Sequence, residues 1–126
     1  MPALVLLVED SPTQAMEIAA NLQKYGFEVQ IAQDGLTALR MVDELHPDLV
    51  VLDVNLPKMD GYQVCRRIKR DPNTAGIPVI MLTVADSSEA TMTGLEAGAD
   101  DYIPKDIFAN ENLISTLQAF DLDVGS

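Results

Sequence analysis

The sequence predicts an α/β protein in which five parallel strands alternate with helices that cover both faces of one sheet. Short, continuous apolar runs rich in valine, leucine and isoleucine are typical of strands buried on both faces. Signals for a helix follow the runs, so the chain has a (βα)5 pattern with mostly short connections. Right-handed crossovers then place helices on both sides of the sheet. The apolar runs are residues 4–8, 49–52, 79–82 and the shorter pair 102–103.

The first helix is expected directly after the first apolar run. Ser11 is a candidate N-cap, Pro12 occupies the first helical position, and Gln14 is placed to complete a capping box. Apolar residues then recur at helical spacing until Gly26 ends the helix. These apolar residues are Ala15, Ile18, Leu22 and Tyr25. Residues 28–32 alternate in polarity, as an edge strand does.

Two further helices have equally clear starts. Asp34-Gly35 opens the second helix, whose expected apolar face consists of Leu36, Leu39, Val42 and Leu45. Asp60-Gly61 opens the third helix, which continues to residue 70 with Cys65 and Ile68 pointing inward. Four basic residues near its end form an expected solvent-exposed face. They are Arg66, Arg67, Lys69 and Arg70.

The C-terminal part of the chain continues the alternation. Ser87 or Ser88 can cap a fourth helix that ends near Gly98. The last helix is expected at residues 110–120, with Leu113, Leu117 and Phe120 inward. Residues 121–126 are expected to be a frayed tail. We therefore expect residues 1–126 to form a single domain with a core at about 4–120.

Composition narrows the class of protein. The chain has 126 residues, 48% of them hydrophobic, without a stretch that could span a membrane or a signal peptide. A single cysteine fits a reducing compartment, so we expect a cytoplasmic protein without membrane insertion. The net charge of −12 would repel a phosphate backbone, which argues against direct nucleic-acid binding.

Reactive polar residues follow the buried runs: Glu9-Asp10, Asp53, Thr83 and Lys105. Because the carboxyl ends of parallel strands share one edge of a sheet, we expect these side chains to converge on one crevice. Crowded carboxylates favour a cation such as Mg²⁺, for which Asp10 and Asp53 are natural ligands together with the main-chain carbonyl of Asn55. Lys105 and Thr83 could bind a phosphate, and an aspartate can itself form an aspartyl phosphate.

Four segments carry a family resemblance: residues 5–15, 49–69, 77–87 and 94–106. They resemble the signature blocks of bacterial response-regulator receiver domains, the CheY-like family, over about residues 4–120. The resemblance implies a flavodoxin-like fold with strand order 2-1-3-4-5, as a stand-alone receiver in a two-component system or phosphorelay.

The resemblance also implies roles for the acids. Asp53 would accept a phosphoryl group from the phosphohistidine of a sensor histidine kinase or a histidine phosphotransfer protein. Asp10 would bind Mg²⁺ directly and Glu9 through a water, with Mn²⁺ as a substitute metal. The domain would act only on itself, through self-phosphorylation and autodephosphorylation, rather than as an enzyme with another substrate.

Three further residues would transmit the signal. Lys105 would pair with the phosphoryl oxygens, Thr83 would hydrogen-bond one of them, and Tyr102 would turn inward. The face formed by the fourth helix, fifth strand and fifth helix would then bind a downstream protein target, from a monomer or weak dimer.

The chain departs from the family pattern at three places. Asp106 follows Lys105 where the family usually has proline, which excludes the common cis Lys–Pro bond. Val84 follows Thr83 where small residues are usual, so we expect slower phosphoryl transfer. Ala85 and Asn55 occupy positions that tune dephosphorylation, and Ala85 predicts a long-lived phosphoryl state.

Three alternatives stay open on the sequence. One is a receiver-like scaffold that binds partners without phosphorylation. A second is a phosphohydrolase with an aspartyl-phosphate intermediate, which would need an acid where Asn55 stands. A third is a carrier of flavin mononucleotide, in which Glu9 and Asp10 would repel the phosphate of the cofactor.

Overall fold

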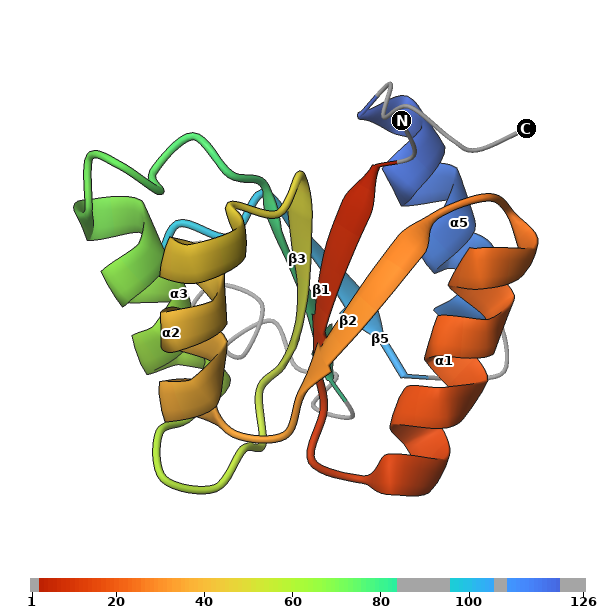
Figure 1. Cartoon of the computed structure of the whole chain (residues 1–126), viewed down its shortest axis with the longest axis horizontal. Helices are drawn as coiled ribbons and strands as arrows, with labels where there is room; N and C mark the ends of the chain where they lie inside the picture. Colours follow the sequence, from red (N-terminus) through yellow and green to blue (C-terminus); the bar gives the residue numbers. More distant parts are fainter. Residues whose placement is uncertain (1–2, 84–95, 106–108, 121–126) are drawn as a thin grey trace.

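The structure is a computed structural model, described for residues 3–83, 96–105 and 109–120. Within these residues, a parallel five-stranded sheet has the order β2-β1-β3-β4-β5 (Figure 1). The strands are β1 (Leu4–Val8), β2 (Glu28–Ala32), β3 (Leu49–Asp53), β4 (Val79–Thr83) and β5 (Asp101–Pro104). The helices are α1 (Pro12–Lys24), α2 (Gly35–Leu45), α3 (Gly61–Arg70) and α5 (Ala109–Ala119). The predicted fold class and strand order are confirmed.

The fourth helix that the sequence predicts, with its caps Ser87 and Ser88, falls mostly outside the described residues. Glu96 is helical, and Gly98 has a φ of +97°, as expected where a helix ends. The tail at residues 121–126 also lies outside the described part of the chain.

Two apolar layers enclose the sheet, as Figure 1 shows: α1 and α5 lie on one face, and α2 and α3 lie on the other. Successive residues of β1 alternate between them, because Val5 and Leu7 pack with α1 and α5 while Leu6 and Val8 pack with α2 and α3. The central strands therefore need apolar residues at every position, which explains the continuous runs in the sequence.

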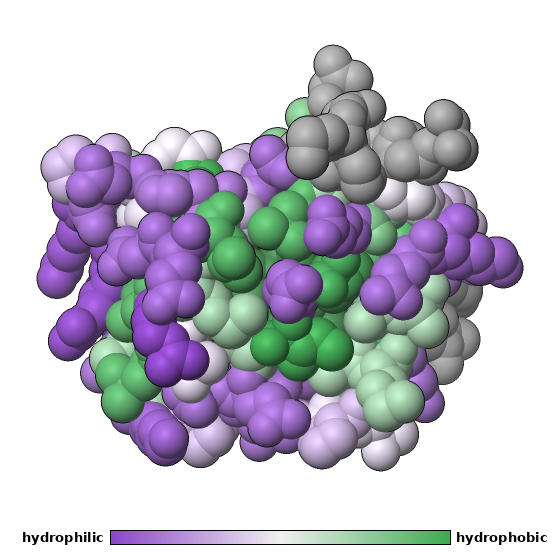
Figure 2. Space-filling model, viewed as in Figure 1, coloured by the Kyte–Doolittle hydropathy of each residue, from purple (hydrophilic) through white to green (hydrophobic). Residues whose placement is uncertain are grey.

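Strand β2 forms one edge of the sheet, as its alternating sequence predicts. Glu28, Gln30 and Ile31 are exposed, whereas Ala32 is buried. Figure 2 shows hydrophobic residues in the middle of the face that contains β2, with hydrophilic residues around them. The edge strand is thus less completely covered than the central strands.

No helix in the described residues has the length and apolarity that crossing a membrane requires.

The predicted N-cap residues lie at the starts of α1, α2 and α3, beyond the carboxyl ends of the preceding strands. The side chain of Ser11 accepts a hydrogen bond from the backbone of Gln14 at 3.4 Å, and Asp34 and Asp60 cap α2 and α3 in the same way. The prediction that Gln14 completes a capping box with Ser11 is wrong, however. The backbone N–H of Ser11 donates to Glu9 Oε1 at 3.2 Å, and the side chain of Gln14 turns toward Lys105 instead.

The apolar face predicted for α2 is only partly right. Val42 is buried and Leu39 is half-buried, but Leu36 is 52% exposed and Leu45 is 41% exposed. The helix packs through Ala38 and Val42, and Leu36 lies two positions before Ala38, about 200° around the helix axis at roughly 100° per residue. Leu45 is the last helical residue, beyond the packed part. Tyr25 is likewise 48% exposed, because it caps the end of α1 rather than packing inside it.

Candidate functional site

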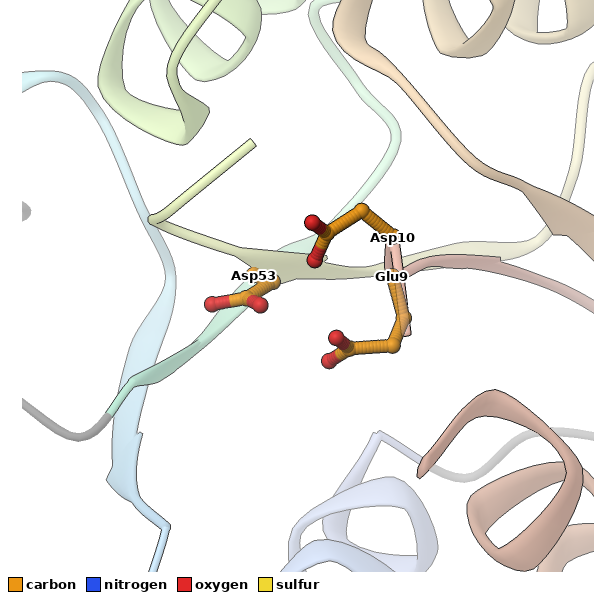
Figure 3. A group of neighbouring side chains, drawn as sticks. All are labelled: Glu9, Asp10 and Asp53. Atoms are coloured by element: carbon orange, nitrogen blue, oxygen red, sulfur yellow. The ribbon is translucent and has the colours of Figure 1, made fainter. Parts of the chain in front are cut away.

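Three carboxylates converge at the carboxyl ends of β1 and β3 (Figure 3). Glu9 and Asp10 directly follow β1, and Asp53 is the last residue of β3. One oxygen from each side chain lies within 4.8 Å of the others. Glu9 and Asp53 are buried, whereas Asp10 is exposed at the mouth of the cluster. An all-oxygen donor set with this charge fits a hard divalent cation such as Mg²⁺.

Lys105, just beyond β5, brings a positive charge to this cluster. Its Nζ donates hydrogen bonds to Glu9 Oε2 at 2.7 Å, Gln14 Oε1 at 2.9 Å and Asp53 Oδ2 at 3.0 Å. Asp10 has no hydrogen bond or ion pair with the described residues. Among the described residues, Lys105 thus pairs with two of the three acids, and the unpaired Asp10 leaves negative charge for a cation to balance.

Burial and charge shift the pKa values at this centre. Burial raises the pKa of Glu9, and the charge of Asp53 raises it further, although the Lys105 ammonium acts in the opposite direction. Burial alone would lower the pKa of Lys105, but the hydrogen bonds and charges of Glu9 and Asp53 outweigh this effect and raise its pKa. Lys105 therefore stays charged at neutral pH and holds both buried carboxyl groups.

The other predicted site residues lie around the acids. Thr83 ends β4 and pairs in register with Pro104, while Asp53 pairs with Leu82, so the backbone of Thr83 lies at the same edge of the sheet. The backbone N–H of Asn55 donates to Asp53 Oδ1 at 3.2 Å. Tyr102 is half-buried in β5 and packs against the layer that contains α2 and α3. Val84, Ala85 and Asp106 lie outside the described residues.

The start of α3 packs directly on the backbone of Asp53. The N–H of Gly61 donates to the carbonyl oxygen of Val54 at 2.8 Å. A Cβ atom at Gly61 would lie 2.4 Å from the carbonyl oxygen of Asp53 and 2.8 Å from the Cα of Val54. Only glycine permits this approach without a backbone shift. Asp53 thus has its backbone braced by α3 and its carboxylate held by Asn55 and Lys105.

Two hollows flank the acids. A hollow of about 410 Å³ opens beside Asp10 and is lined by Asp10, Val54, Asn55, Leu56, Pro57, Asp60 and Tyr62. A second hollow, of about 300 Å³, lies beside Lys105 and between α1 and α5. Its lining residues are Gln14, Glu17, Ile18, Leu82, Lys105, Ala109, Asn110 and Leu113. The site is therefore a partly open crevice at the edge of the sheet, which a group on another molecule could reach.

Two residues contribute to this site in ways that the sequence does not predict. Gln14 is expected from its position to cap α1, yet its side chain contacts Lys105. Gly61 is expected only to open α3, yet it permits the contact with Asp53. Neither contact leaves a local pattern in the sequence, because each depends on segments that meet only in the folded protein.

Comparison with known proteins identifies the relatives of this chain. The family model for the response regulator receiver domain matches residues 5–118. The DNA-binding dual master transcriptional regulator RpaA of Synechocystis is 40% identical over 109 residues, which cover 86% of this chain and 45% of RpaA. The chain thus spans about half the length of this curated relative.

Solved structures agree with the family match. Chemotaxis response regulator CheY4 of Vibrio cholerae has a TM-score of 0.87 and 33% identity, covering 94% of this chain and 98% of CheY4. The receiver domain of sensor histidine kinase PA1611 from Pseudomonas aeruginosa has a TM-score of 0.86 and 33% identity, covering 94% and 97% of the two chains. That structure contains a magnesium ion coordinated in its active-site cleft.

Proposed function

Because the chain belongs to the response regulator receiver domain family of two-component signalling, we propose that it is a Mg²⁺-dependent phosphorylation switch with Asp53 as the phosphoryl acceptor. The observation that carries this proposal is the cluster of Glu9, Asp10 and Asp53 with Lys105 bonded to Asp53. The magnesium ion in the related receiver domain from Pseudomonas aeruginosa supports the choice of metal.

Two hydrogen bonds restrain the carboxylate of the proposed acceptor. Asp53 Oδ1 accepts from the Asn55 backbone and Oδ2 accepts from Lys105, so rotation of the carboxylate is restricted. In the proposed transfer, a carboxylate oxygen of Asp53 forms a bond to phosphorus while the bond between phosphorus and the donor's imidazole nitrogen breaks. The Lys105 ammonium offsets the repulsion between the incoming phosphoryl group and the acids.

The cluster has a place for the metal that this reaction needs. Asp10, Asp53 and the main-chain carbonyl of Asn55 would hold Mg²⁺, with Glu9 acting through a water, and Mn²⁺ could replace it. The bound metal would neutralise charge on the phosphoryl oxygens. Asp10 suits this role because it is exposed and forms no ion pair with the described residues.

The proposed donor is a sensor histidine kinase or a histidine phosphotransfer protein, and the output is binding of a downstream protein. Thr83 and Lys105 would contact the new phosphoryl group, and Tyr102 would respond to it. The added charge would alter the face formed by the fourth helix, β5 and α5. We place this domain, residues 1–126 of the chain, in the cytoplasm, where its single cysteine fits the reducing conditions.

Intact mass after incubation with acetyl phosphate tests this proposal. We expect a Mg²⁺-dependent gain of one phosphoryl group in the wild-type protein. The Asp53→Asn variant and a sample with EDTA should show no gain. If the wild type gains nothing, a phosphorylated histidine kinase replaces acetyl phosphate as donor. Failure with both donors would overturn the proposal and favour a scaffold that binds partners without phosphorylation.

A further inference from the structure

Among the residues that the structure describes, three side-chain oxygens accept hydrogen bonds from the Lys105 ammonium, and Gln14 supplies one of them. Its Oε1 lies 2.9 Å from Lys105 Nζ, beside the bonds to Glu9 and Asp53 at 2.7 and 3.0 Å. A lysine ammonium has three N–H donors, so these three acceptors satisfy it completely. Gln14 is the uncharged acceptor of the three, and it contacts Lys105 from α1, whereas Asp53 contacts it from β3.

The side chain of Gln14 forms this contact instead of a local one. A glutamine three residues after a serine N-cap commonly returns to the N–H of that serine. Here the N–H of Ser11 donates to Glu9 Oε1 at 3.2 Å, which leaves the Gln14 side chain available. Glu9 therefore bonds both Ser11 and Lys105, and Gln14 bonds Lys105 in turn. This network ties the first turn of α1 to the segment after β5.

We propose that Gln14 is a positioning residue that fixes the Lys105 ammonium beside Asp53, and this inference rests on the proposed phosphoryl transfer. A lysine side chain has a flexible four-carbon stem, and two acceptors leave its ammonium free to tilt. The third acceptor removes that freedom without adding charge. A carboxylate at position 14 would instead add a fourth acid to the cluster and compete with the phosphoryl oxygens for Lys105.

The neutral amide also suits the change that phosphorylation brings. When Asp53 becomes an acyl phosphate, Lys105 must exchange its contact with Asp53 for one with the phosphoryl oxygens. Gln14 can keep its bond during this exchange, because an amide oxygen does not draw the ammonium away as strongly as a carboxylate does. Gln14 thus influences the rate of phosphoryl transfer, while the residues proposed to hold Mg²⁺ stay unchanged.

Two substitutions of Gln14 separate its role in positioning the Lys105 ammonium from the effect of charge at this position. Gln14→Met keeps the length of the side chain but removes the acceptor, whereas Gln14→Glu keeps an acceptor and adds a charge. Thr13→Ala, at an exposed neighbouring position of α1, is the matched control. Because Gln14 is itself exposed, all three proteins should fold, and their backbone amide NMR spectra check this point.

The direct measurement is the ¹⁵N–¹H signal of the Lys105 ammonium, assigned by its loss in Lys105→Arg. We expect slow proton exchange in the wild type, in Thr13→Ala and in Gln14→Glu, and faster exchange in Gln14→Met. A Gln14→Met signal identical to that of the wild type would overturn the inference. The absence of a slowly exchanging Lys105 signal in the wild type would also contradict it.

The functional measurement is the initial rate of labelling by acetyl phosphate at saturating Mg²⁺. We expect labelling of Gln14→Met to be about 3- to 10-fold slower, the size of effect that the loss of one solvent-exposed hydrogen bond produces. Gln14→Glu should also be slower although its ammonium signal persists. The Mg²⁺ affinity of Gln14→Met should match that of the wild type. Labelling of Gln14→Met at the wild-type rate would overturn the inference. A wild type that neither acetyl phosphate nor a phosphorylated histidine kinase labels would refute the proposed function, and the NMR result would then decide the positioning role.

Discussion

Asp10 differs from the other two acids of the site in having no partner among the described residues. Its carboxylate oxygen lies within 4.8 Å of oxygens of Glu9 and Asp53, at which distance two charges repel by roughly 3 kcal/mol at an effective dielectric of 20. Solvent and salt reduce this value because Asp10 is exposed. We therefore expect Asp10→Asn to stabilise the Mg²⁺-free protein by about 1 kcal/mol, measured by urea unfolding in EDTA at low salt.

Glu28→Gln is the control for this substitution, because it removes one negative charge at the start of the edge strand β2, far from the cluster. Equal gains in stability for both variants would show that net charge, and not the acid cluster, is responsible. Added Mg²⁺ should reverse the order, because a ligand that binds the folded state stabilises it and Asp10→Asn lacks a proposed ligand. A variant that Mg²⁺ stabilises as strongly as the wild type would contradict the role of Asp10.

At the scale of elements, the contact between the start of α3 and the end of β3 is the tightest feature near the site. A Cβ at Gly61 would meet backbone atoms of Asp53 and Val54, which cannot move aside as a flexible side chain can. We expect Gly61→Ala to lower the free energy of unfolding by about 1–3 kcal/mol, as overpacking does. Because the clash is with the Asp53 backbone, labelling by acetyl phosphate should also slow.

Gly76→Ala is the matched control for Gly61→Ala, since a Cβ at Gly76 would meet nothing within 4 Å. That substitution should leave the labelling rate unchanged and leave stability unchanged or raised by up to about 1 kcal/mol, through the unfolded chain. If Gly61→Ala keeps both the stability and the labelling rate of the wild type, α3 does not brace Asp53.

The starts of the helices were predictable because each depends on local chemistry. Ser11, Asp34 and Asp60 are each followed three residues later by the N–H that they accept from, so the sequence alone locates α1, α2 and α3. Packing faces were less predictable. Lys69, expected on a solvent-exposed basic face, is largely buried and bonds Asp100 at 2.8 Å and the carbonyl of Ile77 at 2.7 Å.

This error has a physical cause. Which side of an amphipathic helix is covered depends on the neighbouring element, and Lys69 lies beside the segments that precede β4 and β5. Arg67 and Arg70, on the same helix, are exposed as expected. A lysine or arginine side chain has an apolar stem and a charged end, so it can lie on either the packed or the exposed face of a helix. Its residue type therefore does not decide its burial.

For the whole molecule, topology explains why the residues of the site could be predicted although the contact between Gln14 and Lys105 could not. Parallel strands of adjacent βα units end at one edge of the sheet, so polar residues at the ends of β1 and β3 and beyond β5 must lie near one another. The sequence therefore predicts the cluster of Glu9, Asp53 and Lys105. The contact between Gln14 and Lys105 joins residues 91 positions apart and depends on side-chain direction, which no periodicity encodes.

At the scale of the whole fold, we expect Cys65 to make stability sensitive to alkaline pH. It is fully buried in the apolar layer under α3, its thiol donates to the carbonyl of Ala97 at 3.4 Å, and burial raises its pKa to about 11 from an ordinary value of 9.0. The unfolded thiol ionises first, so the stability that the neutral thiol provides is complete below pH 9 and is lost as pH rises through 11.

Unfolding by urea at a series of pH values tests this sensitivity against Cys65→Ala. The alanine variant should be less stable at pH 8, because it leaves a small cavity, but its stability should fall less between pH 9 and 11. Between pH 9 and 11, we expect the free energy of unfolding of the wild type to fall by on the order of 2 kcal/mol more than that of Cys65→Ala. Lys105, whose pKa is raised, contributes equally to both proteins and loses its ion pairs only above its ordinary value of 10.5, so it does not obscure the comparison. Parallel curves for the two proteins would mean that the thiol ionises without unfolding the core.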